Sequence, residues 1–284
     1  MAVRTMLDRL ETANWLDRVG DPLQRGVQAV LRGRIRDVLH GVWLGHPLHP
    51  ALVQLPIGAW LSTAVVDALP GADRTATVLT GVGTAGALPA VAAGLNDWAS
   101  LSREQRRIGL VHASVNVVAV GLYTGSLIAR LSGNHHLGRR LAYAGLAGSS
   151  LGAYLGGHLS YRQAAAVNQA EAFLRQIPEG WQDLCAQDAL AEGKPFRASI
   201  GEVPVVVTRT DGAVTAMIGN CGHQTGPLGD GELINVDGAE CLVCPWHGST
   251  FRLSDGVVLH GPAASDQPLL RTREVGGRIQ ASLP

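Results

Sequence analysis

The residues Cys221-Gly222-His223 and Cys244-Pro245-Trp246-His247 form two short motifs in the C-terminal third of this 284-residue chain. Twenty residues separate His223 from Cys244. Each motif is short enough to lie in one loop, so each loop would present one thiol and one imidazole. Thiolates and neutral imidazoles are ligands for transition metals. The spacing therefore predicts that two loops hold one metal centre through Cys221, His223, Cys244 and His247.

Two kinds of centre suit this ligand set. In a Cys2His2 zinc site a helix normally follows the second pair, whereas here a β-type pattern follows His247. In the other kind, a [2Fe–2S] cluster, two thiolates bind one iron and two imidazoles bind the other. The sequence favours the cluster and leaves zinc as the alternative.

Hairpin signals surround the two motifs. Asp211-Gly212 separates the apolar runs 203–207 and 214–218, and Gly276-Gly277 separates 274–275 from 278–281. Such dipeptides between strand-like runs are typical of two-residue β-turns. They predict an all-β domain over residues 177–284.

This region resembles the Rieske ferredoxin family. The resemblance rests on Cys-Pro-Trp-His-Gly at 244–248, the turn at 254–256, and Gly261-Pro262-Ala263. It implies a [2Fe–2S] cofactor on the four ligands above. Family members from cytochrome bc complexes carry an extra cysteine in each loop, and here Gly226 and Trp246 stand at those places. The resemblance is therefore to the ferredoxin and oxygenase type.

The first half of the chain is apolar. Charge-free runs cover 38–66, 75–96, 108–129 and 141–161, and about 20 residues cross a bilayer as a helix. They predict an all-α four-helix transmembrane bundle over 46–160. An arginine-bearing amphipathic segment, 1–45, would precede it and a linker helix, 161–176, would follow. The fold class is thus multi-domain, an N-terminal helical bundle plus a C-terminal all-β Rieske domain.

A second resemblance concerns the bundle. Gly45-His46-Pro47-Leu48-His49-Pro50 and Gly156-Gly157-His158-Leu159-Ser160-Tyr161 resemble a bacterial four-helix membrane family of unknown function. Some of its members are fused to Rieske domains. The resemblance covers about 40–165, supports the topology and implies no activity.

Four histidines are expected at one end of the bundle: His46, His49, His112 and His158. Polar groups at membrane depth are costly and frequently functional. Imidazoles on facing helices could ligate a b-type haem, hold another metal or bind a quinone. Alternatively, they only anchor the helix ends at the headgroups. The sequence leaves these readings open.

Charge gives the expected location. The net charge is zero, so no nucleic-acid partner is expected. The first 45 residues contain no secretory signal pattern. Near the helix ends, more arginines lie on the side of the termini than on the opposite side. They predict a multi-pass cell-membrane protein with both termini and the Rieske domain in the cytoplasm.

The expected function is that of a membrane-anchored electron-transfer protein. Its partners would be a redox protein or a quinone, with membrane lipid around the bundle. The alternatives are a ferredoxin component that feeds an oxygenase, and a redox sensor. Only 37 residues follow His247, which favours a carrier over a terminal oxygenase. If the protein is an enzyme, it is expected to be an oxidoreductase.

Overall fold

The computed structural model describes residues 2–263 and 265–284. The chain forms two compact units, each described here by itself. The helical unit comprises Met1–Ile35 and Leu48–Ala165. The β unit comprises Arg36–Pro47 and Ala166–Pro284. The segment Arg36–Pro47 thus precedes the main helices in sequence but belongs to the β unit.

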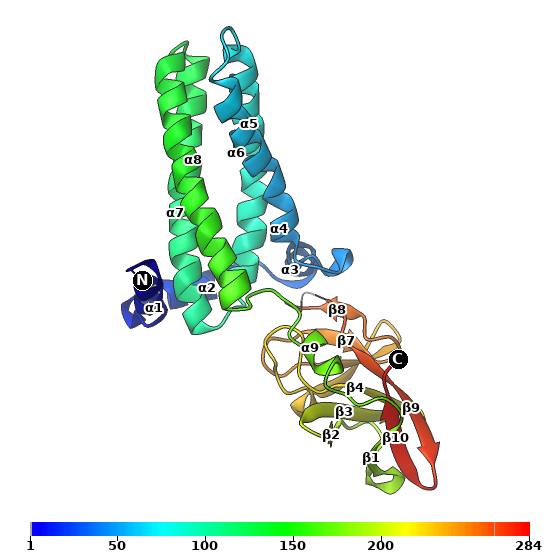
Figure 1. Ribbon diagram of the computed structural model, residues 1–284. Helices are drawn as coiled ribbons and strands as arrows, with labels where there is room; N and C mark the ends of the chain where they lie inside the picture. The colour runs from blue at the N-terminus through cyan, green and yellow to red at the C-terminus, as the bar shows by residue number, and fades with distance from the viewer. Residues whose placement is uncertain (1, 264) are drawn as a thin grey trace. The chain divides into compact units, whose positions relative to one another are not determined.

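The helical unit is built on two helical hairpins (Figure 1). Helix α4 (Leu48–Leu52) leads into α5 (Gln54–Val66), which packs on α6 (Asp73–Trp98), and α7 (Arg103–Leu131) packs on α8 (His135–Gly157). Short turns join α5 to α6 and α7 to α8, so each pair is antiparallel. A capping box at Ser102 and Gln105 starts α7, with the Gln105 amide N–H donating to Ser102 Oγ.

Two helices in the described part of the chain, α6 and α7, are long and apolar enough to cross a membrane. Only 28% and 22% of their most apolar windows are buried within the protein. Most of their apolar side chains therefore face outward, unlike those of a soluble core helix. Four helices were expected to be spans, but α5 has only 13 residues and α8 carries Arg139 and Arg140 near its start.

The first predicted span is divided because proline interrupts it. Pro56 has no N–H to donate to the carbonyl of Leu52, where α4 ends. The helical hydrogen bonds on either side of this gap are kept: the Val53 N–H donates to His49 O, and the Ile57 N–H donates to Val53 O. The two pieces form one kinked helix in place of the expected continuous one.

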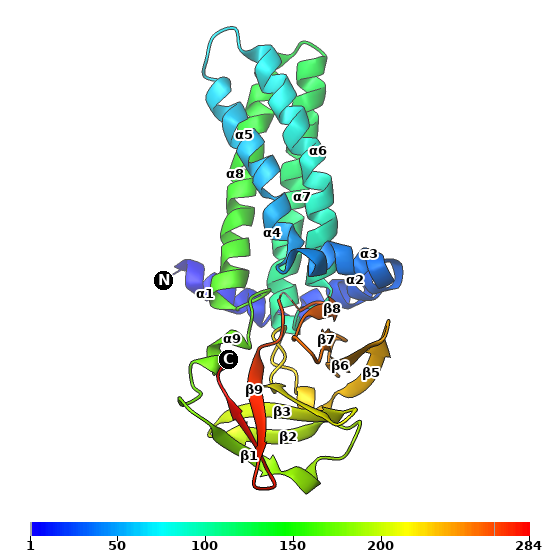
Figure 2. The same ribbon diagram turned by 90° about the vertical axis from the view of Figure 1, so that its right-hand side faces the viewer.

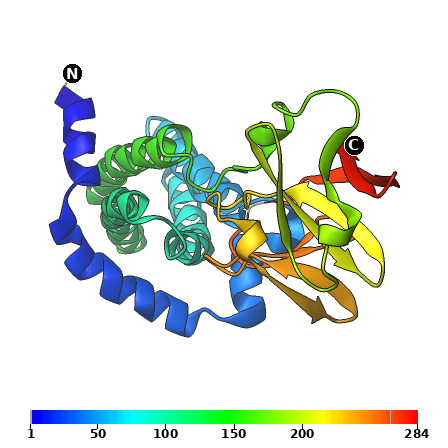
Figure 3. The same cartoon turned by 90° about the horizontal axis from the view of Figure 1, so that it is seen from below.

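The N-terminal segment folds onto the end of the bundle. Helices α1 (Ala2–Glu11) and α2 (Asp17–Val30), joined by η1 (Asn14–Leu16), pack against α7 and curve round the helices in Figure 3. Arg107 reaches Asp17 at 2.6 Å, and Arg106 reaches Asp21 at 2.8 Å. On α2, the apolar side chains of Val19, Leu23 and Val30 are exposed.

Direct contacts close the bundle at two levels. At the end away from α1, Arg130 on α7 forms a buried ion pair with Asp67 at 2.6 Å, and both side chains are at most 1% exposed. In the middle, Trp60 on α5 stacks on Tyr123 on α7, with ring centres 4.1 Å apart. Arg130, near the end of α7, is thus buried by this pair.

The β unit consists of two antiparallel sheets (Figure 2). The larger has the strand order β1-β10-β9-β4-β3-β2 and the smaller β5-β6-β7-β8. The strands are β1 (Gln182–Ala186), β2 (Phe196–Ile200), β3 (Val203–Thr210), β4 (Ala213–Ile218), β5 (Glu232–Val236), β6 (Ala239–Val243), β7 (Thr250–Arg252), β8 (Val258–His260), β9 (Leu269–Val275) and β10 (Arg278–Ser282).

Both predicted hairpins are present. Thr210 pairs with Ala213 across Asp211-Gly212, and Val275 pairs with Arg278 across Gly276-Gly277. All four turn residues have positive φ, as a type I′ turn requires. The first hairpin makes β3 and β4 neighbours in the larger sheet, and the second does the same for β9 and β10.

The connection between the units is mostly irregular. After α8, η3 (His158–Arg162) continues the helix for one widened turn, and α9 (Glu171–Leu174) is a single short turn. A linker helix over 161–176 was expected, but Ala164 and Ala166 have positive φ and end the helix there. Two further helical elements, α3 (Gly33–His40) and η2 (Val42–Leu44), lie before α4 in the chain, and η4 (Gln187–Ala189) and η5 (Leu228–Asp230) lie within the β unit.

Candidate metal centre

Two loops of the β unit have the same internal hydrogen bonding. In the first, 221–226, the Cys221 N–H donates to Gly226 O at 2.8 Å and the Thr225 N–H donates to Cys221 O at 2.9 Å. In the second, 244–249, the Cys244 N–H donates to Ser249 O at 2.8 Å and the Gly248 N–H donates to Cys244 O at 3.1 Å. The first follows β4, and the second joins β6 to β7. The two loops are thus structural counterparts, each presenting one cysteine and one histidine.

The cysteines of the two loops meet. Cys221 and Cys244 are buried, and their side chains hydrogen-bond to each other. The Cys221 thiol, followed by the N–H groups of Trp246 and His247, lowers the pKa of Cys244. The same contact raises the pKa of Cys221, because a second negative charge beside the first is unfavourable. A cation between the two sulfurs would remove that conflict.

The histidines of the two loops meet as well. Their Nδ1 atoms are 3.3 Å apart, and the ring planes are nearly perpendicular at 87°. Burial lowers the pKa of His223 to about 3, and the nearby positive charges of His247, His40 and Arg36 add to this. Burial also lowers the pKa of His247. Both imidazoles are therefore neutral at pH 7, the form that binds metals.

The four ligands thus form two separate pairs. In the described residues no three His, Cys, Asp or Glu side chains gather as one metal ion would require. A structural zinc needs four protein ligands around one point. A thiol pair beside an imidazole pair instead suits two metals with two protein ligands each. A [2Fe–2S] cluster fits this arrangement, with its sulfides completing the coordination of each iron.

Buried polar side chains hold the loops in place. Gln267, only 1% exposed, accepts a hydrogen bond from the Gly222 N–H at 3.0 Å and donates to Ile218 O and Asn220 O. The Ser249 hydroxyl bonds to Cys221 and accepts from the Ala263 N–H at 3.1 Å. Gln267 lies in no sequence motif and was not predicted from the sequence.

The segment Arg36–Pro47 also packs at this end of the β unit. Asp37 accepts a hydrogen bond from the Gly261 N–H at 3.0 Å and pairs with His260 at 2.8 Å. Val42 packs against the buried cluster that contains Cys221 and Cys244. In the segment that follows the bundle in sequence, the Gln169 N–H donates to Gly222 O at 2.8 Å. Both connecting segments therefore touch the loops around the predicted centre.

Comparison with known families agrees with this geometry. Residues 180–274 match the family model of the Rieske [2Fe–2S] domain, and 45–169 match a family described as a predicted membrane protein, DUF2231. This chain joins a Rieske [2Fe–2S] domain to a DUF2231 domain. The expected fold class is thereby confirmed, although the helical region contains more helices than the four expected.

Individual relatives match the Rieske domain. A human Rieske domain-containing protein is 32% identical over 74 residues, which cover 26% of this chain and 47% of the relative. The oxygenase component of dicamba O-demethylase from Stenotrophomonas maltophilia is 33% identical over 87 residues, 30% of this chain and 24% of the relative. The chain thus spans less than half the length of these curated relatives. The Sphingomonas yanoikuyae B1 ferredoxin structure is 23% identical, with 37% of this chain and all of that chain covered, at a TM-score of 0.33.

Gly226 shows why the first loop of the Rieske domain lacks an extra cysteine. A Cβ at Gly226 would lie 2.7 Å from Cys244 Sγ and 3.3 Å from the Trp246 ring. A side chain there would collide with Cys244, one of the four predicted ligands, unless Cys244 moved. The four cysteines are all free thiols, and Trp246 is 57% exposed beside His247.

The four bundle histidines do not form one layer. His49 and His112 approach each other, with ring centres 6.4 Å apart. His158 instead bonds to Glu11 on α1 at 2.9 Å. His46 lies in the segment assigned to the β unit, exposed, with Nδ1 3.1 Å from Pro47 O. The structure therefore selects two of the four predicted residues.

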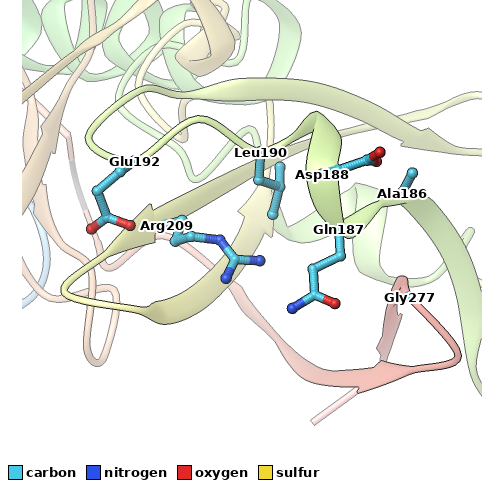
Figure 4. A pocket seen from close by; sticks show the side chains of 7 residues that line it. All are labelled: Ala186, Gln187, Asp188, Leu190, Glu192, Arg209 and Gly277. Atoms are coloured by element: carbon cyan, nitrogen blue, oxygen red, sulfur yellow. The ribbon is translucent and has the colours of Figure 1, made fainter.

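A surface hollow of about 690 Å³ lies elsewhere on the β unit (Figure 4). Its lining includes Gln187, Asp188, Glu192 and Arg209, and none of the four cluster ligands. Gln187 and Arg209 both contact Glu274. The hollow contains none of the predicted ligands, and two of its polar side chains are already bonded to Glu274, so we assign it no role in the metal centre.

Proposed function

We propose that this protein is a membrane-anchored one-electron carrier whose [2Fe–2S] cluster is held by Cys221, His223, Cys244 and His247. The observation that carries the proposal is the pairing of two thiols and two neutral imidazoles on matched loops. A cluster with histidine on one iron accepts and returns a single electron at a higher potential than an all-cysteine cluster. The exposed Trp246 beside His247 offers a contact for a redox partner.

Membrane anchoring is supported by the outward-facing apolar surface of α6 and α7. The exposed apolar face of α2 suits the headgroup region of a bilayer. The connection to the cluster loops is short, because Val42 packs beside the cluster cysteines and the helical unit resumes at Leu48. Lipid would surround the bundle, and the electron partner would be a quinone, a redox protein or a centre within the bundle.

A second candidate function has its own support. The 33% identity to an oxygenase component over the Rieske domain favours delivery of electrons to an oxygenase. The two functions differ in the electron acceptor. The reduced protein in vesicles should be reoxidised without an oxygenase, by added quinone or by another membrane redox partner, if it is a membrane carrier, and only by the oxygenase if it is a ferredoxin component. A redox sensor would need neither acceptor.

The cluster assignment is tested by iron and sulfide analysis of the purified full chain. We expect about two irons and two acid-labile sulfides per chain and a rhombic electron paramagnetic resonance signal on reduction. Cys221→Ser should abolish the signal. Cys241→Ser is the matched control, because Cys241 is a buried free thiol of the same unit outside the four ligands. Stoichiometric zinc in freshly prepared protein would contradict the proposal.

A further inference from the structure

The end of the bundle near α1 contains a pair of histidines between the two helical hairpins. His49 lies on α4 and His112 on α7, and both rings are half-buried. Their centres are 6.4 Å apart and their planes are inclined at 83°. At the other two levels of the bundle the hairpins are joined by direct contacts, Arg130 with Asp67 and Trp60 with Tyr123.

Hydrogen bonds fix the protonation of both imidazoles. His49 Nδ1 is 2.8 Å from Ala90 O on α6, and His112 Nδ1 is 2.8 Å from Gly152 O on α8. A carbonyl oxygen only accepts hydrogen bonds, so each Nδ1 carries the proton. With the proton on Nδ1, the lone pair that could bind a metal lies on Nε2 of each ring, and on His112 the Asn116 Nδ2 approaches this atom to 3.4 Å and Nδ1 to 3.5 Å. A backbone carbonyl on one nitrogen and a metal on the other is the usual arrangement of a ligating histidine.

Glycines hold the rings in these positions. A Cβ at Gly94 on α6 would lie 2.8 Å from His49 Nδ1, and one at Gly156 on α8 would lie 3.2 Å from His112 Cε1. Asn116, one turn after His112, packs on Gly152, where a Cβ would lie 2.6 Å from its amide. Each imidazole is thus seated on the neighbouring helix of its own hairpin.

The separation of the rings matches two imidazoles on opposite sides of one metal. Two metal–nitrogen bonds of about 2.0 Å in a line place the ring centres a little over 6 Å apart. A zinc ion would need further protein ligands, and in the described residues no third His, Cys, Asp or Glu joins this pair. A haem iron needs only two axial ligands, since its porphyrin supplies the other four nitrogens.

We propose that His49 and His112 are the axial ligands of a b-type haem bound between the two hairpins of the bundle. The proposal rests on the bundle geometry and stands independently of the cluster assignment. It excludes His46 and His158 as ligands. With both axial positions filled by neutral imidazoles, the iron would be six-coordinate and suited to exchange of single electrons.

The test uses the full chain, produced in cells supplied with a haem precursor and purified in detergent. We expect about one haem b per chain by the pyridine haemochrome assay. His49→Ala and His112→Ala should each lower the haem content at least tenfold. His136→Ala is the matched control, because His136 is exposed at the far end of α8, and it should retain haem. His158→Ala should retain it as well.

A conservative variant separates ligation from folding. His112→Met should keep haem with a changed absorption spectrum, because a thioether is also an axial ligand. Helical circular dichroism and the cluster resonance signal check that each variant is folded. A folded wild-type chain without haem would overturn the proposal. Haem retained by both His49→Ala and His112→Ala, or a different metal in its place, would overturn it equally.

Discussion

His223 and His247 face each other through Nδ1, which leaves each Nε2 on the far side of its ring. Burial disfavours a positive charge on the His223 ring, and with two imidazoles only 3.3 Å apart, protonating both is unfavourable as well. The folded chain therefore keeps both rings neutral, the form in which imidazole binds a metal. In the metal-free protein this lowers the stability of the fold in acid, because the folded state excludes protons that the unfolded chain accepts.

This difference predicts how the metal-free chain responds to acid. His223 has a pKa of about 3 when folded and about 6.5 when unfolded. Below pH 6.5 the unfolded chain binds a proton that the folded chain does not, so stability is present above that pH and falls as pH falls. The slope approaches about 1.4 kcal/mol per pH unit. This slope is measured by urea unfolding between pH 7 and pH 5, after a chelator has removed the metal from the protein. The variant His223→Gln should show a smaller slope. Equal slopes for the two proteins would contradict the cause given.

At the scale of elements, the segment Arg36–Pro47 is the least expected part of the β unit. It comes before the bundle in sequence, yet Asp37 binds the loop that follows β8 and Val42 enters the core beside the cluster cysteines. Arg36 and His40 lie near enough to add positive charge at His223. The segment therefore completes the wall of the cluster site.

Removing the Asp37 carboxylate should loosen this wall. In Asp37→Ala the buried N–H of Gly261 loses its acceptor, which costs about 1–3 kcal/mol. We expect the free energy of unfolding of the β unit to fall by that amount, as measured by loss of cluster absorption in denaturant. Asp183→Ala is the matched control, because Asp183 pairs with Arg278 on the exposed face of β1 and β10. An exposed pair contributes under about 1 kcal/mol. Equal losses in the two variants would mean that Arg36–Pro47 does not support the site.

Across the whole molecule, the sequence predicted the features that depend on residues close together in the chain. The spacing of Cys221, His223, Cys244 and His247 predicted two matched loops, and Asp211-Gly212 predicted its hairpin. Contacts between distant residues left no periodic signal. Asp67 with Arg130, Gln267 with Gly222, and Asp37 with Gly261 are separated by 63, 45 and 224 residues. The choice of His49 and His112 from four candidates likewise depends on helix packing that the pattern of residues does not encode.

The same contacts bear on the orientation of the chain in a membrane. Arginines that the structure buries in ion pairs, Arg106, Arg107 and Arg130, are poor markers of a cytoplasmic loop. Without these three, more arginines still lie on the side of the termini than on the other side. They are Arg32, Arg34, Arg36, Arg103 and Arg162 on the side of the termini, and Arg74, Arg139 and Arg140 on the other. The bias keeps its sign, so the rule of positive residues inside still predicts that the termini are in the cytoplasm.

Two antiparallel hairpins return the chain to its starting side, so both termini should share that compartment. We expect a fluorescent reporter fused after Pro284 to be active in the cytoplasm and an alkaline phosphatase fused there to be inactive. The matched control places each reporter in the turn between α7 and α8, at 132–134, where the pattern should reverse. The same result at both positions would mean that α8 does not cross the bilayer. An active phosphatase at the C-terminus alone would mean that the orientation is the reverse of the predicted one. The free thiols Cys185 and Cys241 of the Rieske domain would then lie in an oxidising compartment and be open to oxidation.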